Sequence, residues 1–257
     1  MTIAANYTLF YGEEFIEYSV KSIYDHVDKI YMSVGEMSWK NHHGKRFEPI
    51  DNLLEKVYEI PDPDKKIEIF TGIWDGDTEQ RNFLLDKCIG NYDYAMLIDS
   101  DEVWEKREIE GLKGVAEEFK EDPQIKVIAV DIIQYYKSLY WGHKCTNIRG
   151  VNYLYKADGT IHHEWIRHPG TVPTHKCSAY YHHYGYAYPM DIIKKKVKMW
   201  GHSSEVDEKW FKTYKDWTPY HGQALSPTGD LWEPMIEREL IPEMKGHRLS
   251  KVNYYTK

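Results

Sequence analysis

The sequence predicts a doubly wound α/β fold, in which helices cover both faces of a mostly parallel, Rossmann-like central sheet. Over the first half of the 257-residue chain, strand-length apolar runs alternate with stretches of helical periodicity. The run at 94–98 is apolar without interruption, as parallel strands are when helices cover both sides of the sheet. It stops at three acids within four positions, Asp99, Asp101 and Glu102.

The first elements follow from spacing. Residues 2–10 are expected to form a strand, and 13–27 a helix, because Ile16, Val20, Ile23 and Val27 recur at helical intervals. A strand at 29–34, a short helix at 51–58 and a strand at 67–70 come next. The alternation of strand and helix favours parallel pairing of these strands.

The next helix is expected to begin near Asp77, where Asp77 and Gln80 suit a capping box: Asp77 would accept from first-turn amides and Gln80 would reach back. It leads into the strand at 94–98. A polar helix at 106–120 and a strand at 127–133 follow, and then short strands and loops rich in His, Tyr and Gly. The last clear helix is expected at 190–200, and residues 201–257 as an irregular extension packed over the front of the domain.

Composition excludes several classes of protein. The formal net charge is −8, from 41 acids and 33 bases, so no basic surface of the kind used for general nucleic-acid binding is expected. No apolar run is long enough for a membrane span and the N-terminus lacks a signal-peptide pattern, so we expect a cytoplasmic protein. Three widely spaced cysteines fit reduced thiols. The oligomeric state is not indicated.

The acids at the end of the 94–98 run suggest a metal site. Ligands of open α/β sheets bind outside the carboxyl ends of the strands, and alternation along an extended backbone lets Asp99 and Asp101 point the same way. Two carboxylates there suit Mg²⁺ or Mn²⁺ with a phosphate-bearing ligand. A solvated acidic turn would give the same pattern.

Four segments, taken in order, carry a resemblance to a known family. TLFYGEEFIEYSVKSI resembles an opening strand, Asn-Glu-Glu turn and first helix, with Gly12 in place of the usual Asn. GIWDGDTEQRNFLLDKCIGNYDYAMLIDSDEVW resembles a Glu-Gln-Arg-Asn helix and an Asp-x-Asp-Glu strand end. IHHEW and YYHHYGYAYPMDIIKKKVKMW resemble a His-Glu element and a closing His-Tyr segment with its Lys-rich helix. Together they resemble the family-two glycosyltransferases, particularly bacterial lipopolysaccharide-core glucosyltransferase-like members, which have the glycosyltransferase-A fold. Ser33-Val34-Gly35-Glu36 departs from the Asp usual after the second strand.

The resemblance implies a metal-dependent glycosyltransferase that moves a hexose from a nucleoside diphosphate sugar to a glycan or other hydroxyl acceptor. It implies a catalytic domain at 1–200, with a nucleotide-sugar half at 1–104 and an acceptor half at 105–200. Asp101, Asp99 and His183 are assigned as ligands of Mn²⁺ or Mg²⁺, with Glu102 as an outer acceptor. His183 would either complete the metal shell or touch the diphosphate.

Donor contacts are assigned to Asp99, Arg81, Gln80 and Glu13 of the acidic turn, where Arg81 would either hold Asp99 or reach the diphosphate. If the enzyme inverts the anomeric centre, a carboxylate must take the acceptor's proton. Glu164 is the candidate base, with Asp131 and Asp191 as weaker alternatives. Lys194, Lys195 and Lys196 could approach an anionic donor, but a solvated helical face is the favoured interpretation.

Other classes fit less well. The zincin spacing fails because His163 and His168 are five positions apart rather than four. A dehalogenase-type phosphatase would place its Asp pair after the first strand. A nucleotidyltransferase is closer in fold but needs a Gly-rich, basic loop where this chain is acidic at Glu13 and Glu14. A non-catalytic nucleotide-sugar or carbohydrate-binding protein would explain the many aromatic residues without explaining the acids.

Overall fold

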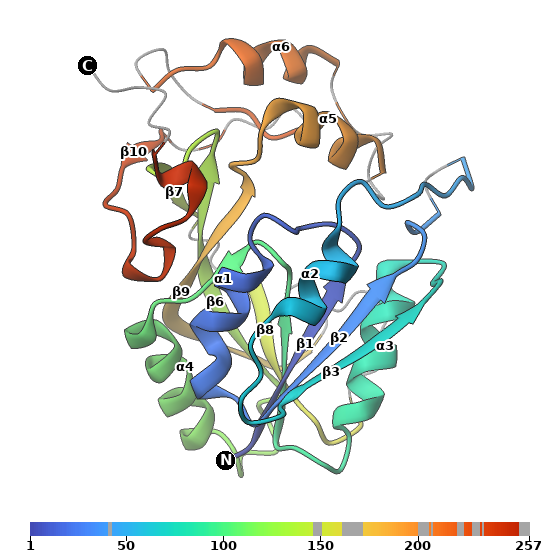
Figure 1. Cartoon of the computed structure of the whole chain (residues 1–257). Coiled ribbons are helices and arrows are strands. Elements are labelled where there is room, and N and C mark those ends of the chain that lie inside the picture. Colours follow the sequence, from blue (N-terminus) through green and yellow to red (C-terminus); the bar gives the residue numbers. More distant parts are fainter. Residues whose placement is uncertain are drawn as a thin grey trace.

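A mixed β-sheet forms the centre of the molecule (Figure 1). The computed structural model describes residues 1–40, 43–145, 151–160, 172–199, 206, 208–219, 224–227, 232 and 234–251. The strands are β1 Ile3–Leu9, β2 Lys29–Gly35, β3 Ile67–Gly72, β4 Tyr94–Ile98, β5 Glu102–Val103, β6 Val127–Tyr136, β7 Trp141–Cys145, β8 Val151–Lys156, β9 Thr174–Tyr186 and β10 Ile236–Glu237. The helices are α1 Ile16–Ile23, α2 Leu53–Glu59, α3 Asp77–Cys88, α4 Lys106–Glu118, α5 Met190–Met199 and α6 Glu208–Asp216, with 3-10 helices at Tyr24–His26, Pro242–Met244 and Arg248–Lys251.

The sheet has the order β10-β7-β6-β8-β4-β1-β2-β3. Pairing is parallel from β3 through β2 and β1 to β4, and antiparallel from β4 through β8, β6 and β7 to β10. Strand β9 runs parallel to β6 and also pairs with the short β5. The predicted α/β class is confirmed: β1 to β4 in the first half of the chain pair in parallel, and the second half adds antiparallel pairs and the parallel pair of β6 and β9.

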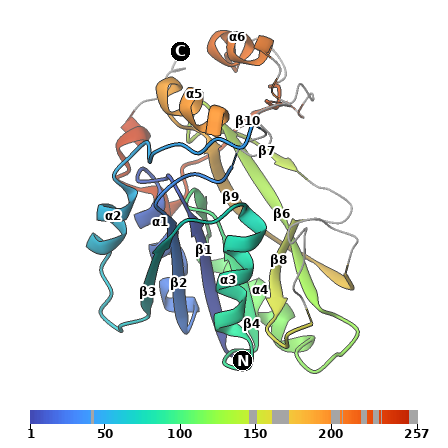
Figure 2. The ribbon, with the colours of Figure 1, turned by 90° about the vertical axis from the view of Figure 1, so that its right-hand side faces the viewer.

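Helices cover both faces of the parallel strands (Figures 1 and 2). Every residue of β1 and β4 is buried, and alternate side chains serve opposite faces. Tyr7 and Met96 belong to the core under α1, α2 and α4, whereas Ala4 and Leu97 pack with Leu84 on the α3 side. The uninterrupted apolar runs in the sequence reflect this two-sided burial.

Two local predictions are wrong. The capping box does not form: Gly76 is the N-cap of α3, and the Gln80 side chain instead bonds the backbone at the ends of β1 and β2. The extension after residue 200 contains a helix, α6, whose buried residues Trp210 and Tyr214 lie one turn apart. Bulky aromatic residues among charges hid its periodicity.

Helices α5 and α6 lie over the carboxyl ends of the parallel strands (Figure 1). A second core joins them to the sheet, with Trp210 and Tyr214 packed among Phe15, Tyr135 and Tyr184. The described part of the C-terminal extension thus shares a core with residues from the first 200. Among the described residues, no helix has the length and apolar character needed to cross a bilayer. All three cysteines are free thiols.

Candidate active site

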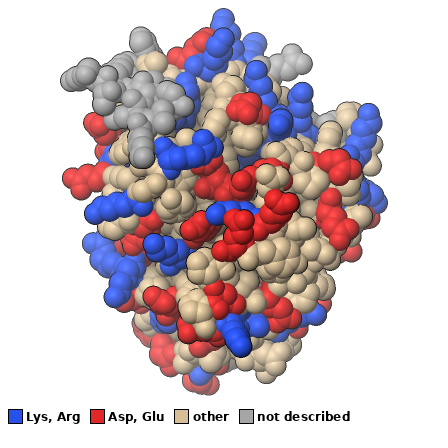
Figure 3. Space-filling view, in the orientation of Figure 1, with Lys and Arg blue, Asp and Glu red and all other residues tan. Residues whose placement is uncertain are grey.

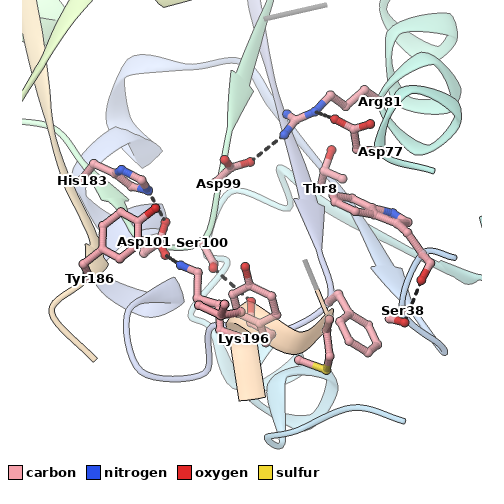
Figure 4. A pocket seen from close by; sticks show the side chains of 15 residues that line it. Thr8, Ser38, Asp77, Arg81, Asp99, Ser100, Asp101, His183, Tyr186 and Lys196 are labelled. Carbon is pink, nitrogen blue, oxygen red and sulfur yellow. Dashed lines mark hydrogen bonds and ion pairs between the residues drawn. The ribbon is translucent and has the colours of Figure 1, made fainter. Parts of the chain in front are cut away.

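A pocket of about 230 Å³ lies at the carboxyl ends of β1 and β4 (Figure 4). It is lined by residues from five parts of the chain: Thr8, Phe10 and Tyr11; Ser38 and Trp39; Asp77 and Arg81; Asp99, Ser100 and Asp101; and His183, Tyr186, Lys196, Val197 and Met199. The acidic segment therefore opens into a cleft at the edge of the sheet where the sequence predicted a ligand.

Asp99 is the first residue after β4, and a guanidinium fixes its side chain. Arg81 Nη2 donates to Asp99 Oδ1 at 3.0 Å. Arg81 is itself only 6% exposed; its Nε atom lies 3.8 Å from Asp77 Oδ2, and its Nη1 atom has no hydrogen-bond partner among the described residues. A buried guanidinium donor without a partner is costly, so Nη1 points to a missing acceptor. Thr8 Oγ1, also buried in the pocket wall, has the same property within the described part of the chain.

Asp101 is 2% exposed and contacts two basic side chains, one on each oxygen. His183 Nε2 lies 3.2 Å from Oδ1, and Lys196 Nζ lies 3.0 Å from Oδ2. The Nδ1 atom of His183 pairs with Gln134 Oε1 at 2.7 Å, which orients the ring. Burial alone would raise the pKa of Asp101, but the charges of Lys196 and His183 hold that pKa well below its usual range.

Lys196 reaches the pocket because of its place on α5. It lies three positions after Ile193, and Ile193 and Val197 are buried, so it shares their inward face. Lys194 and Lys195 are exposed. The predicted solvated face is thus correct for those two lysines and wrong for Lys196. The spacing from Ile193 was the signal in the sequence.

The third acid, Glu102, points away from this pocket. Its Oε2 atom accepts from the Tyr153 hydroxyl at 2.9 Å and from the backbone N–H of Asp99 at 3.2 Å. Trp104 Nε1 in turn donates to the Tyr153 hydroxyl at 2.9 Å. Glu102 is 1% exposed, so it holds the acidic turn from behind.

Gly12 brings the loop after β1 against the acidic turn. Its φ is +126°, and a Cβ atom there would stand 1.9 Å from Ser100 Oγ. Ser100 Oγ donates to the carbonyl of Tyr11 at 3.0 Å. An asparagine, like any residue with a Cβ atom, would not fit this approach.

The remaining predicted residues lie elsewhere. Gln80 is 1% exposed and bonds Ser33 and Trp39 beneath the pocket rather than lining it. The Glu13 carboxylate accepts a hydrogen bond from the backbone N–H of Asn52. Glu13 therefore lines a second, acidic cavity of about 630 Å³ instead of the first pocket. Neither is placed to contact a ligand in the first pocket.

Neither of the candidate bases that the structure describes, Asp131 and Asp191, lines the pocket. Glu164, with His162 and His163, lies outside the described residues. Asp131 is buried between Lys144 at 3.2 Å and Lys176 at 2.9 Å, and does not line the pocket. Asp191 is exposed on α5.

No protein-family model matches this sequence, and no curated protein sequence matches it. Solved structures similar to it include fragment 1–349 of S. aureus TarS, with a TM-score of 0.47, 11% identity, and coverage of 77% of this chain and 64% of that one. The same fragment with UDP-GlcNAc gives a TM-score of 0.46, 12% identity, and coverage of 80% and 70%. The structure of GalNAc-T7 with UDP, GalNAc and Mn²⁺ gives a TM-score of 0.45 and 8% identity, with coverage of 71% of this chain and 44% of that one. This chain thus spans less than two thirds of the length of the first TarS structure.

The donor set does not fit a divalent metal as it is arranged. No group of three or more His, Cys, Asp or Glu side chains suited to an ion occurs within the described ranges. Of the three predicted ligands, Asp101 and His183 contact each other, while Asp99 contacts Arg81. Two unit charges 4 Å apart interact by about 4 kcal/mol near a protein surface, and by about twice that when one ion is divalent. Lys196 would therefore repel an ion bound to Asp101.

Proposed function

We propose that this chain is a glycosyltransferase that moves a hexose from a nucleoside diphosphate sugar to a hydroxyl group of a glycan or related acceptor. One observation carries the proposal: two fixed pairs of base and carboxylate, Arg81–Asp99 and Lys196–Asp101, face one pocket at the carboxyl ends of parallel strands. The four sequence segments that resemble family-two glycosyltransferases of the glycosyltransferase-A fold support it.

The chemistry of sugar transfer matches this arrangement. When the bond between the anomeric carbon and the diphosphate breaks, negative charge grows on the leaving phosphate. Buried donors that are already oriented stabilise such charge best, and Arg81 offers Nη1 in the pocket wall. Phe10, Tyr11 and Trp39 line the same pocket and give flat apolar faces for a base or a sugar ring.

The proton of the acceptor needs a base if the anomeric centre inverts. We keep Glu164 as the proposed base. The alternative Asp131 is held between two lysines away from the pocket, and Asp191 is exposed on α5. The sequence resemblance predicts Mn²⁺ or Mg²⁺ at this site. The proposed chemistry does not use a metal ion, because both Asp99 and Asp101 are paired with basic side chains.

The test is release of nucleoside diphosphate from a panel of nucleotide sugars, measured by chromatography with EDTA and with Mn²⁺. Slow donor hydrolysis needs no knowledge of the acceptor. We expect at least one donor to be hydrolysed, and Asp101→Asn to lose most of this activity while its melting curve keeps a single transition. Asp216→Asn, exposed on α6, is the matched control and should keep wild-type rates.

No hydrolysis of any donor under either condition would refute the glycosyltransferase assignment. If nucleotide sugars bind in titration calorimetry without being hydrolysed or transferred, the chain is a nucleotide-sugar-binding protein. Pyrophosphate release from nucleoside triphosphates and a sugar would instead identify a nucleotidyltransferase.

A further inference from the structure

We infer that the ammonium of Lys196 takes the role at the donor's diphosphate that the sequence assigned to a divalent cation. The inference rests on the proposed function and deepens it by naming the group that faces the leaving phosphate. Lys196 and a metal ion would be alternative partners of one carboxylate, Asp101.

The ammonium of Lys196 is fixed in the pocket wall. Its Nζ donates to Asp101 Oδ2 and to the carbonyl of Gly185, both at 3.0 Å. Three tyrosine rings surround it, with centroids 5.2 Å away at Tyr11, 5.9 Å at Tyr186 and 5.0 Å at Tyr188. Such rings attract a cation through their faces, so the charge is held at one place. The side chain is 15% exposed.

The position of this ammonium suits an anion in the pocket. In Figure 4 the Lys196 side chain extends from α5 to the acidic turn and meets Asp101 beside Ser100. Lys196, Asp101 and Arg81 line the same cavity, so both basic groups face a ligand bound in it. Charge-assisted hydrogen bonds from donors that are already oriented stabilise developing negative charge without any metal.

Asp101 is already fully engaged. One oxygen contacts His183 at 3.2 Å and the other contacts Lys196 at 3.0 Å. A metal ion at either oxygen would have to approach the ammonium or displace it. A neutral side chain in place of Lys196 should therefore weaken diphosphate binding and, at the same time, improve metal binding at Asp101.

The experiment measures binding rather than turnover. A panel of nucleoside diphosphates, and the nucleoside matching the tightest of them, are titrated calorimetrically in EDTA and then in Mn²⁺. Wild type, Lys196→Met, Lys196→Arg and Lys195→Met are compared, the last being a control because Lys195 is exposed on the same helix. Mn²⁺ alone is titrated into each protein.

We expect the wild type to bind a nucleoside diphosphate in EDTA, with less than about a twofold gain from Mn²⁺. Lys196→Met should weaken diphosphate binding about tenfold or more, with nucleoside binding unchanged, because one charge-assisted bond is lost. Lys196→Arg should stay within a few-fold of wild type, Lys195→Met should match it, and Mn²⁺ alone should bind Lys196→Met more tightly than wild type.

Diphosphate binding by the wild type only with Mn²⁺ would overturn the inference and leave the proposed function standing. The inference would also be overturned if Lys196→Met bound nucleoside diphosphate in EDTA as tightly as the wild type does. Absence of any nucleotide binding under both conditions would remove the proposed function and the inference together. If Lys196→Met does not fold, the wild type and Lys196→Arg in EDTA decide, since both must bind without metal.

Discussion

Gly12→Ala should destabilise the protein through one contact. The new Cβ would lie 1.9 Å from Ser100 Oγ and 2.4 Å from Ser100 Cβ, so the acidic turn must move. A φ of +126° costs an alanine about 1–3 kcal/mol, and loss of the bond from Ser100 Oγ to the Tyr11 carbonyl adds about 1 kcal/mol. The sum is about 2–4 kcal/mol. In a chain of this length the melting temperature should fall by roughly 5–15 °C.

Urea unfolding and thermal melts measure this loss. Gly90→Ala is the matched control, because its φ of +73° is also left-handed but an added Cβ meets no described atom within 4 Å. It should cost only about 1–2 kcal/mol. Gly12→Ala should also cost less when Ser100 is already glycine. Its destabilisation, measured as the difference between the double variant Gly12→Ala/Ser100→Gly and Ser100→Gly alone, should be smaller by about 1 kcal/mol or more than in the wild-type background. Gly12→Ala no worse than Gly90→Ala, or strictly additive effects, would refute the reasoning.

Three further outcomes are expected. Arg81→Met removes the partner of Asp99 and should weaken nucleoside diphosphate binding about ten- to a hundredfold in calorimetry; unchanged affinity would contradict a donor contact. Burial, and then the charge of Arg238, lower the pKa of His143 to about 4. The folded state therefore favours the neutral ring of His143. This preference contributes fully to the free energy of unfolding above pH about 6.5, and the contribution falls by roughly 3 kcal/mol as the pH is lowered toward 4. Urea unfolding of His143→Gln should lack that part of the pH dependence, and an identical slope would disprove it. Glu164→Gln should keep nucleotide-sugar affinity but slow transfer by roughly 10²–10⁴-fold, whereas a wild-type transfer rate would exclude it as the base.

The sequence predicted the parallel half of the sheet well, because two-sided burial leaves a direct mark. The apolar run at β4 and the acids after it placed the pocket at the correct edge. The contact between Asp99 and Arg81 was one of the two roles predicted for Arg81. Asp101 and His183 were predicted to share a metal ion, and they contact each other instead.

The other features depend on tertiary packing. Three consecutive lysines on α5 resemble a solvated face, and only the burial of Ile193 and Val197 turns Lys196 inward. Asp77 and Gln80 fit the pattern of a capping box, but the Gln80 side chain donates instead to backbone carbonyls at the ends of β1 and β2. The long-range partners of Gln80 leave no periodic signal in a single sequence, whereas the helical spacing from Ile193 does mark Lys196.

The short strand β5 ties the acidic turn to β9. By position Glu102 and Val103 belong to the first half of the chain, yet they pair with His183 and His182, and the amide of Tyr184 donates to the carbonyl of Asp101 at 2.8 Å. Separation of the two halves would therefore take the acidic turn apart. We therefore expect the two halves to unfold together. The amides of Val103 and Tyr184 should exchange with deuterium only when the whole chain unfolds. A cut between residues 104 and 105 should give two fragments that fold only when they associate.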